Sequence, residues 1–227
     1  MPEGVAVRDG AAVHRHRLVR RVLAVRGEVR FVADVAPRFD YARAAHQVEL
    51  VDGGAVFGSR ELTLGLSSPR PLEFRRRRDV RAALTLRAGE SASFVLERLE
   101  PGQDPARASE AEIQDELEAT IAFWRRWLAG SRYAGRWREM VDRSALTLKL
   151  LTYQPTGAIV AAPITSLPEQ LGGGRIWDYR YAWLRDAAFT HYALLTLGFT
   201  DEAASFMGWL ARSASATPTA ASRGRSR

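Results

Sequence analysis

The spacing of hydrophobic residues changes once along this chain, close to residue 105, and this change constrains the fold more than any other feature. Before it, short runs rich in β-branched and aromatic residues alternate with polar ones, as in Ala82-Ala83-Leu84-Thr85-Leu86. After it, hydrophobic residues recur at three and four positions, which is the helical spacing. The sequence therefore predicts a β region followed by an α region.

The β region is expected to form antiparallel strands. Glycine-containing turns separate the runs at residues 26–28, 52–54 and 88–90, and Asp52-Gly53-Gly54 supplies the positive φ that tight hairpins need. Regular short strands with such turns are typical of a sandwich. The predicted strands cover residues 18–25, 29–35, 48–51, 62–66, 80–86 and 93–99.

A Pro- and Gly-containing linker at residues 100–105 leads into the first predicted helix. Ser109 and Glu112 have the spacing of a capping box. The helix then places five hydrophobic residues on one face, which predicts that this face is buried; they are Ile113, Leu117, Ile121, Trp124 and Leu128.

Three more helices are predicted. The first covers about residues 135–151 and is hydrophobic on more than one side, so we expect it to be buried widely. The second covers 183–197 and ends at Gly198, a good residue for a helix C-terminus. The third follows Thr200, with an apolar face of Ala203, Phe206, Met207 and Leu210. Residues 213–227 consist mainly of Ser, Ala, Thr, Pro and Arg and predict a disordered, low-complexity tail.

Composition excludes several classes of function. The chain has no cysteine, and its histidines (His14, His16, His46 and His191) lack metal-ligand spacing, so we expect no metal and no organic cofactor. No apolar run approaches the ~20 residues that span a bilayer, so no membrane association is expected. The net charge is +7, but the basic residues are almost all arginine, and the run at residues 75–78 is interpreted as a solvated loop. We therefore expect no nucleic-acid partner.

The stretch from Trp177 to Ala187 carries the chemistry. It reads Trp-Asp-Tyr-Arg-Tyr-Ala-Trp-Leu-Arg-Asp-Ala and follows a glycine run. Rings can pack on the C–H face of a pyranose, while the adjacent Arg185 and Asp186 can grip neighbouring hydroxyls with charge-assisted hydrogen bonds. A structural ion pair beside core aromatic residues would give the same composition, so this pattern alone leaves both interpretations open.

The same stretch is similar to glycoside hydrolase family 15, the glucoamylase-like enzymes. The residues that carry the resemblance are Asp178-Tyr179, Tyr181, Trp183 and Arg185-Asp186, with residues 161–169 and 198–203 in the expected order around them. The resemblance is close over residues 120–210 and looser over 1–100, which look like the β-sandwich of bacterial trehalase-like members. Ala182 and Ile176 depart from residues that are usual in that branch.

The resemblance implies a fold in which a partial antiparallel β-sandwich precedes the first helices of an (α/α)6 barrel. It divides the chain into a sandwich at 1–103, a linker helix at 104–130, the start of the barrel at 131–212 and the tail at 213–227. It also implies a cytoplasmic location and an α-glucoside or oligosaccharide substrate, with trehalose and α-glucans both open. Barrel helices left exposed would favour self-association.

The family hydrolyses α-glucosidic bonds with inversion. By resemblance, Arg185 and Asp186 hold the terminal glucose and Tyr179 and Trp183 line its pocket, with Trp177 and Tyr181 as further candidates for substrate binding. The general acid and general base are expected downstream of this chain, so none of its residues is assigned a catalytic role. Among the local carboxylates, Asp186 beside Arg185 suits binding rather than proton donation.

Two interpretations of function follow. In the first, the chain is a fragment of a glucan α-glucosidase or trehalase that is inactive alone, because both catalytic glutamates are absent. In the second, it is a non-catalytic β-sandwich and helical module that acts in protein association.

Overall fold

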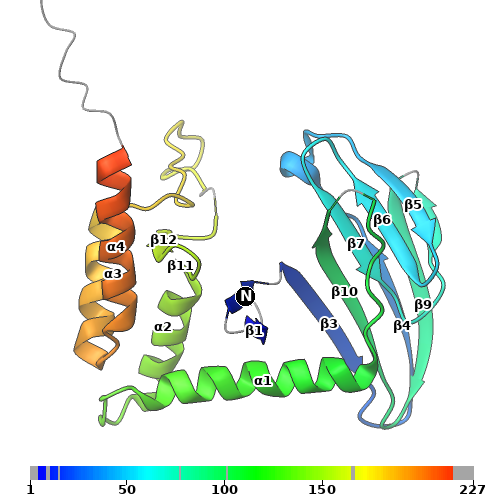
Figure 1. The fold of residues 1–227 in the computed structure, drawn as a ribbon, viewed down its shortest axis with the longest axis horizontal. Helices are drawn as coiled ribbons and strands as arrows, with labels where there is room; N and C mark the ends of the chain where they lie inside the picture. The colour runs from blue at the N-terminus through cyan, green and yellow to red at the C-terminus, as the bar shows by residue number, and fades with distance from the viewer. Residues whose placement is uncertain are drawn as a thin grey trace, which may run out of the picture. The chain divides into compact units, whose positions relative to one another are not determined.

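The computed structural model describes residues 5–8, 11–14, 16–76, 78–100, 102–164 and 167–216. The chain divides into two compact units, residues 1–121 and 122–227, and the division falls inside the first helix. The order of elements is β strands followed by four α-helices, as the change in hydrophobic period predicts (Figure 1).

The first unit contains two larger antiparallel sheets and a short hairpin. The five-stranded sheet has the order β3 (Arg17–Leu23), β10 (Ser91–Leu99), β7 (Thr63–Ser67), β6 (Gly54–Gly58) and β5 (Gln47–Val51). The three-stranded sheet has the order β4 (Glu28–Val35), β9 (Asp79–Arg87) and β8 (Glu73–Arg76). The hairpin pairs β1 (Val5–Arg8) with β2 (Ala11–His14).

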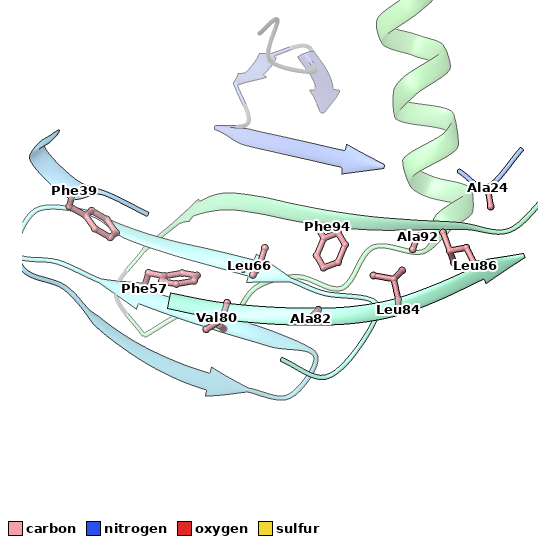
Figure 2. Close-up of a cluster of buried hydrophobic side chains, with 11 residues drawn as sticks. Ala24, Phe39, Phe57, Leu66, Val80, Ala82, Leu84, Leu86, Ala92 and Phe94 are labelled. Carbon is pink, nitrogen blue, oxygen red and sulfur yellow. The ribbon is translucent and has the colours of Figure 1, made fainter. Parts of the chain in front are cut away.

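The core of this unit lies between the two larger sheets. Strand β9 buries every second residue from Val80 to Leu86, which is the period of a strand with one face in a core. Figure 2 shows these side chains near Phe57, Leu66 and Phe94 from the five-stranded sheet. Because both sheets contribute to one buried cluster, they have the arrangement of a β-sandwich.

The predicted turns and most of the predicted strands are confirmed. Gly27, Gly53 and Gly89 all have positive φ. The sequence does not predict strand β6, because its residues Gly-Ala-Val-Phe-Gly form a short run bounded by glycines. The interpretation of the arginine run as a solvated loop is wrong for Arg75 and Arg76, which lie in strand β8; Arg75 forms an ion pair with Asp34 at 3.0 Å.

Helix α1 (Glu110–Ala129) begins with the predicted capping box. The Ser109 hydroxyl accepts from the Glu112 N–H at 3.2 Å, and the Glu112 carboxylate accepts from the Ser109 N–H at 2.7 Å. The prediction that the apolar face of this helix is buried is only partly correct. Ile113 is buried, but Leu117 and Ile121 are exposed. Glu110 and Glu116 in the first half of this helix form hydrogen bonds with Arg21 and Arg17 of strand β3.

The second unit contains α2 (Arg138–Leu150), a short hairpin of β11 (Thr152–Tyr153) and β12 (Ala158–Ile159), α3 (Leu184–Leu197) and α4 (Asp201–Ala216). Two small apolar clusters hold it together, one around Leu194 and Phe199 and the other around Ile159 and Phe206. Helix α4 extends four residues into the segment that the composition predicts to be a disordered tail, and residues 217–227 lie outside the described residues.

The helices of this unit expose large apolar side chains. The prediction that α2 is buried on several sides is wrong for this structure, where Ala145 is the buried residue of that helix and Trp137, Met140 and Leu150 are exposed. Met207 of α4, expected on an apolar face, is also exposed. Four helices do not define an (α/α)6 barrel, so that part of the fold remains a prediction.

Candidate functional site

The aromatic and charged stretch lies between the glycine-rich loop and the first turn of α3. Trp183 has an extended backbone and directly precedes the helix, which starts at Leu184. The N–H groups of Ala161 and Ala162 donate to the carbonyls of Tyr181 and Tyr179 at 3.1 and 2.9 Å. These two hydrogen bonds attach the backbone of residues 179–181 to the segment that follows β12.

Trp183 is the centre of an aromatic wall. Its ring centroid lies 5.4 Å from that of Tyr179 and 6.0 Å from that of Trp177, which meets it almost perpendicularly. The indole N–H of Trp183 donates to the carbonyl of Asp178 at 3.0 Å, so the orientation of this ring is set by the backbone. Three of the four predicted rings are therefore brought together.

Tyr181 is not part of this wall. Its side chain is largely exposed, and the ring contacts among the described residues do not include it. Its backbone carbonyl, which accepts from Ala161, is the part that holds the site. Tyr181 therefore acts here as a backbone support, and a role for its ring in binding stays a prediction.

Arg185 and Asp186 lie beside the wall in the first turn of α3. Their side chains are hydrogen-bonded to each other, with Nη2 of Arg185 3.2 Å from Oδ2 of Asp186. The side chain of Arg185 is 67% exposed and that of Asp186 is 32% exposed, so neither is turned into a packed interior. The guanidinium carbon of Arg185 lies 5.8 Å from the Trp183 ring. A planar donor, a carboxylate and an aromatic face thus lie close together, and such groups can form charge-assisted hydrogen bonds and stacking contacts with a polar ring.

The other two local carboxylates already accept hydrogen bonds. Asp178 forms an ion pair with Arg180, and its Oδ1 also accepts from the backbone N–H of Arg180 at 3.0 Å. Glu169 accepts from the indole N–H of Trp177 at 2.6 Å. The sequence alone assigns no firm role to Glu169. A contact with Trp177 could have been predicted from the sequence, because the carboxylate and the indole lie on opposite sides of a glycine run that can fold back on itself.

A cleft of about 810 Å³ lies elsewhere, in the first unit. Charged side chains such as Arg17, Arg98 and Glu116 line it, together with His16, and its lining includes no Phe, Tyr or Trp. A sugar ring would find no large aromatic face there, so we place the candidate site at the aromatic stretch and not at this cleft.

Within the described ranges, no group of three or more His, Asp or Glu side chains is placed to bind a metal ion. None of the helices in the described part of the chain combines the length and apolar character that crossing a bilayer requires.

Comparison with known proteins shows a relationship to glycosidases. Residues 135–221 match the model of glycosyl hydrolases family 15. The chain is 38% identical over 179 residues to a trehalase of Thermoplasma acidophilum, covering 79% of this chain and 30% of that protein. It is 37% identical over 207 residues to a trehalase of Mycolicibacterium smegmatis, covering 86% of this chain and 30% of that protein. No solved structure gives a significant match.

Residues 135–221 therefore belong to glycoside hydrolase family 15, and the related trehalases extend the likeness over most of the chain. Within that class it is trehalase-like in sequence, since related trehalases align with both of its units. It spans about 30% of the length of these curated relatives.

Proposed function

We propose that this chain supplies the glucose-binding part of an inverting family 15 glycosidase that cleaves α-glucosidic bonds, and that the substrate of the whole enzyme is trehalose. The observation that carries the proposal is the exposed Arg185–Asp186 pair beside the ring of Trp183. The relatives named above are trehalases, which favours trehalose over α-glucans. A cytoplasmic location, implied by the family resemblance, belongs to the same proposal.

The geometry of the site supports the following roles, which are part of the proposal. Trp183 and Tyr179 provide the apolar surface against which one face of a glucose unit packs. Arg185 donates to a sugar hydroxyl, and Asp186 accepts from an adjacent one. Trp177 closes one side of the wall at a right angle to Trp183.

We propose that the 227-residue chain does not hydrolyse glycosides by itself. Inversion needs a general acid and a general base about 6.5–9.5 Å apart, with room for water between them. Each carboxylate beside the aromatic wall is engaged with a neighbouring donor: Glu169 with an indole, Asp178 with Arg180 and Asp186 with Arg185. Release of glucose from trehalose or maltose by the purified chain would refute this part of the proposal.

Binding of sugar tests the main proposal directly. Glucose and trehalose are titrated into the purified chain, and binding is followed by tryptophan fluorescence and by saturation-transfer NMR. We expect R185A and D186A each to weaken binding about tenfold or more, the scale of a lost charge-assisted hydrogen bond. R143A, which removes an exposed arginine from α2, is the matched control and should bind as the wild type does. Equal binding by R185A, D186A and the wild type would overturn the assignment.

A second candidate function is protein association, which the exposed apolar faces favour. Phe189, Tyr192 and Leu195 of α3 are exposed, and no acidic or basic side chain lies between Ala187 and Leu197 except His191. Faces of this kind commonly mark contact surfaces. Sedimentation of the wild type and of F189S/Y192S, from micromolar to millimolar concentration, tests this candidate. A monomeric wild type throughout that range would exclude self-association.

A further inference from the structure

We infer that Glu169 is a positioning residue for the glucose site, acting on the sugar through the indole ring of Trp177. The inference rests on the proposed function, because it concerns how one wall of the proposed site is held. Glu169 and Trp177 lie on opposite sides of the glycine-rich loop, and Oε1 of Glu169 accepts from Nε1 of Trp177 at 2.6 Å.

Glu169 closes this loop with two hydrogen bonds. Besides the side-chain contact, its backbone N–H donates to the carbonyl of Arg175 at 3.1 Å. Between these anchors lie Gly172, Gly173 and Gly174, and Gly172 has a φ of +75°. Glycines give the chain more conformations to lose on ordering than other residues do. The two hydrogen bonds of Glu169 span these glycines. They therefore order the far end of the loop, where Trp177 lies.

The two tryptophans of the wall are held by different kinds of acceptor. The indole of Trp183 donates to the backbone carbonyl of Asp178, which no side-chain substitution removes. The indole of Trp177 donates to a side chain, and Trp177 as a residue is 45% exposed, so packing contributes less to holding its ring in place. Without Glu169, Trp177 keeps its ring but loses the contact that sets the right angle to Trp183.

An ordered aromatic wall binds sugar more tightly than a mobile one, because the binding free energy is not then reduced by the cost of immobilising the indole ring of Trp177. The carboxylate of Glu169 is occupied by the indole nitrogen, so its contribution to sugar binding passes through Trp177. The effect should therefore appear in affinity for sugar and should depend on the presence of the indole N–H.

The contact itself can be measured by NMR. Indole N–H signals of the wild type are assigned by W177F and W183F, and their chemical shifts are compared in E169A, E169Q and E139A. We expect E169A to move the Trp177 signal and to leave the Trp183 signal in place. E169Q retains an acceptor oxygen and should move the Trp177 signal less. Glu139 is an exposed carboxylate in the first turn of α2, and E139A is the control.

The positioning role is measured by sugar affinity. We expect E169A to weaken binding of glucose by about threefold to tenfold, the scale of one net hydrogen bond. E169Q should recover most of this loss, and E139A should bind as the wild type does. In a W177F background, which has no indole donor, E169A should cause no further loss.

Three results would overturn the inference, and they differ from one another. An unchanged Trp177 signal in E169A would show that the contact is absent in solution. A moved signal with unchanged affinity, or an equal loss in the W177F background, would show that Glu169 does not act through this ring. Absence of sugar binding by the wild type would defeat the proposed function, and with it the positioning role, even if the NMR signals confirm the contact.

Discussion

Lys149, in the last turn of α2, forms an ion pair with Glu202, in the first turn of α4, with Nζ 2.7 Å from Oε1. The same oxygen accepts from the indole N–H of Trp127 at 2.8 Å. The side chain of Glu202 is 4% exposed, so these contacts join three helices around one buried carboxylate. The helix dipoles also favour this arrangement, because the positive Lys149 lies at the C-terminal end of α2 and the negative Glu202 lies at the N-terminal end of α4.

The first prediction concerns this ion pair. K149A should destabilise the second unit by about 3 kcal/mol or more, because it leaves a buried carboxylate with one donor fewer. E202Q should cost less, since the amide oxygen still accepts from Trp127. Urea unfolding followed by tryptophan fluorescence checks this, because all six tryptophans of the chain lie in residues 122–227. A loss no larger than that of a surface substitution would contradict it.

The pH dependence of Glu202 follows from the same contacts. Burial alone would raise its pKa, but hydrogen bonds from Lys149 and Trp127 outweigh burial, and the pKa lies below the usual value. A lowered pKa in the folded state stabilises the protein above the unfolded pKa of about 4.3, and this stability is lost as the pH falls through the folded value. In E202Q this acid-dependent part of the unfolding free energy should disappear.

His191 gives a second prediction about pH. It is buried in α3 beside Phe206, and neither ring nitrogen has a hydrogen-bond partner among the described residues. Burial lowers its pKa, and the nearby carboxylate of Glu202 opposes this only in part. Below the unfolded pKa of about 6.5 the unfolded chain takes up a proton that the folded chain does not, so stability falls as the pH drops.

The variant H191L tests this effect. It should remove the loss of stability that begins near pH ~6.5 in the wild type. Urea unfolding is measured by tryptophan fluorescence at several values between neutral pH and the onset of acid unfolding, with E202Q to separate the contribution of Glu202. A wild type and an H191L variant with parallel pH profiles would show that His191 does not titrate in this way.

The third prediction concerns Arg38 and Asp79 in the first unit. The guanidinium donates to both oxygens of the buried carboxylate, at 2.8 and 3.3 Å. These hydrogen bonds lower the pKa of Asp79, so they stabilise the protein above the unfolded pKa of about 3.9 and lose that effect as the pH falls through the folded value.

R38A should lower the urea midpoint of this unit, and R38K should recover only part of the loss, because lysine cannot form the paired contact. Far-ultraviolet circular dichroism follows the unfolding. Tryptophan fluorescence serves as the internal control. Residues 1–121 contain no tryptophan, so this signal reports the unfolding of the second unit, which R38A should leave unchanged. An R38K variant as stable as the wild type would show that the paired geometry is unimportant.

The fourth prediction contrasts two glycines. Gly198 follows α3 with a φ of +98°, and its N–H and that of Phe199 donate to the carbonyls of Leu195 and Leu194, which is the Schellman arrangement. Gly208 lies inside α4 with ordinary helical geometry. We expect G198A to destabilise the second unit by about 1 kcal/mol or more, because the φ is strained for alanine and the new Cβ would also lie 2.9 Å from Cγ of Arg132. G208A should stabilise it by less than about 1 kcal/mol, because the new Cβ would lie 3.2 Å from Nη1 of Arg212, the end of a flexible side chain that has to shift. Thermal unfolding of both variants distinguishes these opposite signs.

Local sequence determined much of the fold. The alternation in residues 82–86 and the glycine turns specify strands and hairpins, the Ser109–Glu112 spacing specifies the start of α1, and Gly198 specifies the end of α3. These features depend on neighbours within a few residues, so a single sequence carries them. The sequence also indicates the Arg185–Asp186 pair and the rings beside it as candidate site residues, because the family motif that contains them is contiguous.

Tertiary structure decided what depends on distant residues. Arg75 of β8 pairs with Asp34 of β4, two strands away in the same sheet, and so belongs to a sheet rather than a loop. Glu169 meets Trp177 because three glycines allow the loop to fold back, and Glu202 meets Lys149 and Trp127 because three helices converge. Hydrogen bonds and ion pairs of this kind are set by the path of the whole chain, and no local pattern in the sequence encodes them.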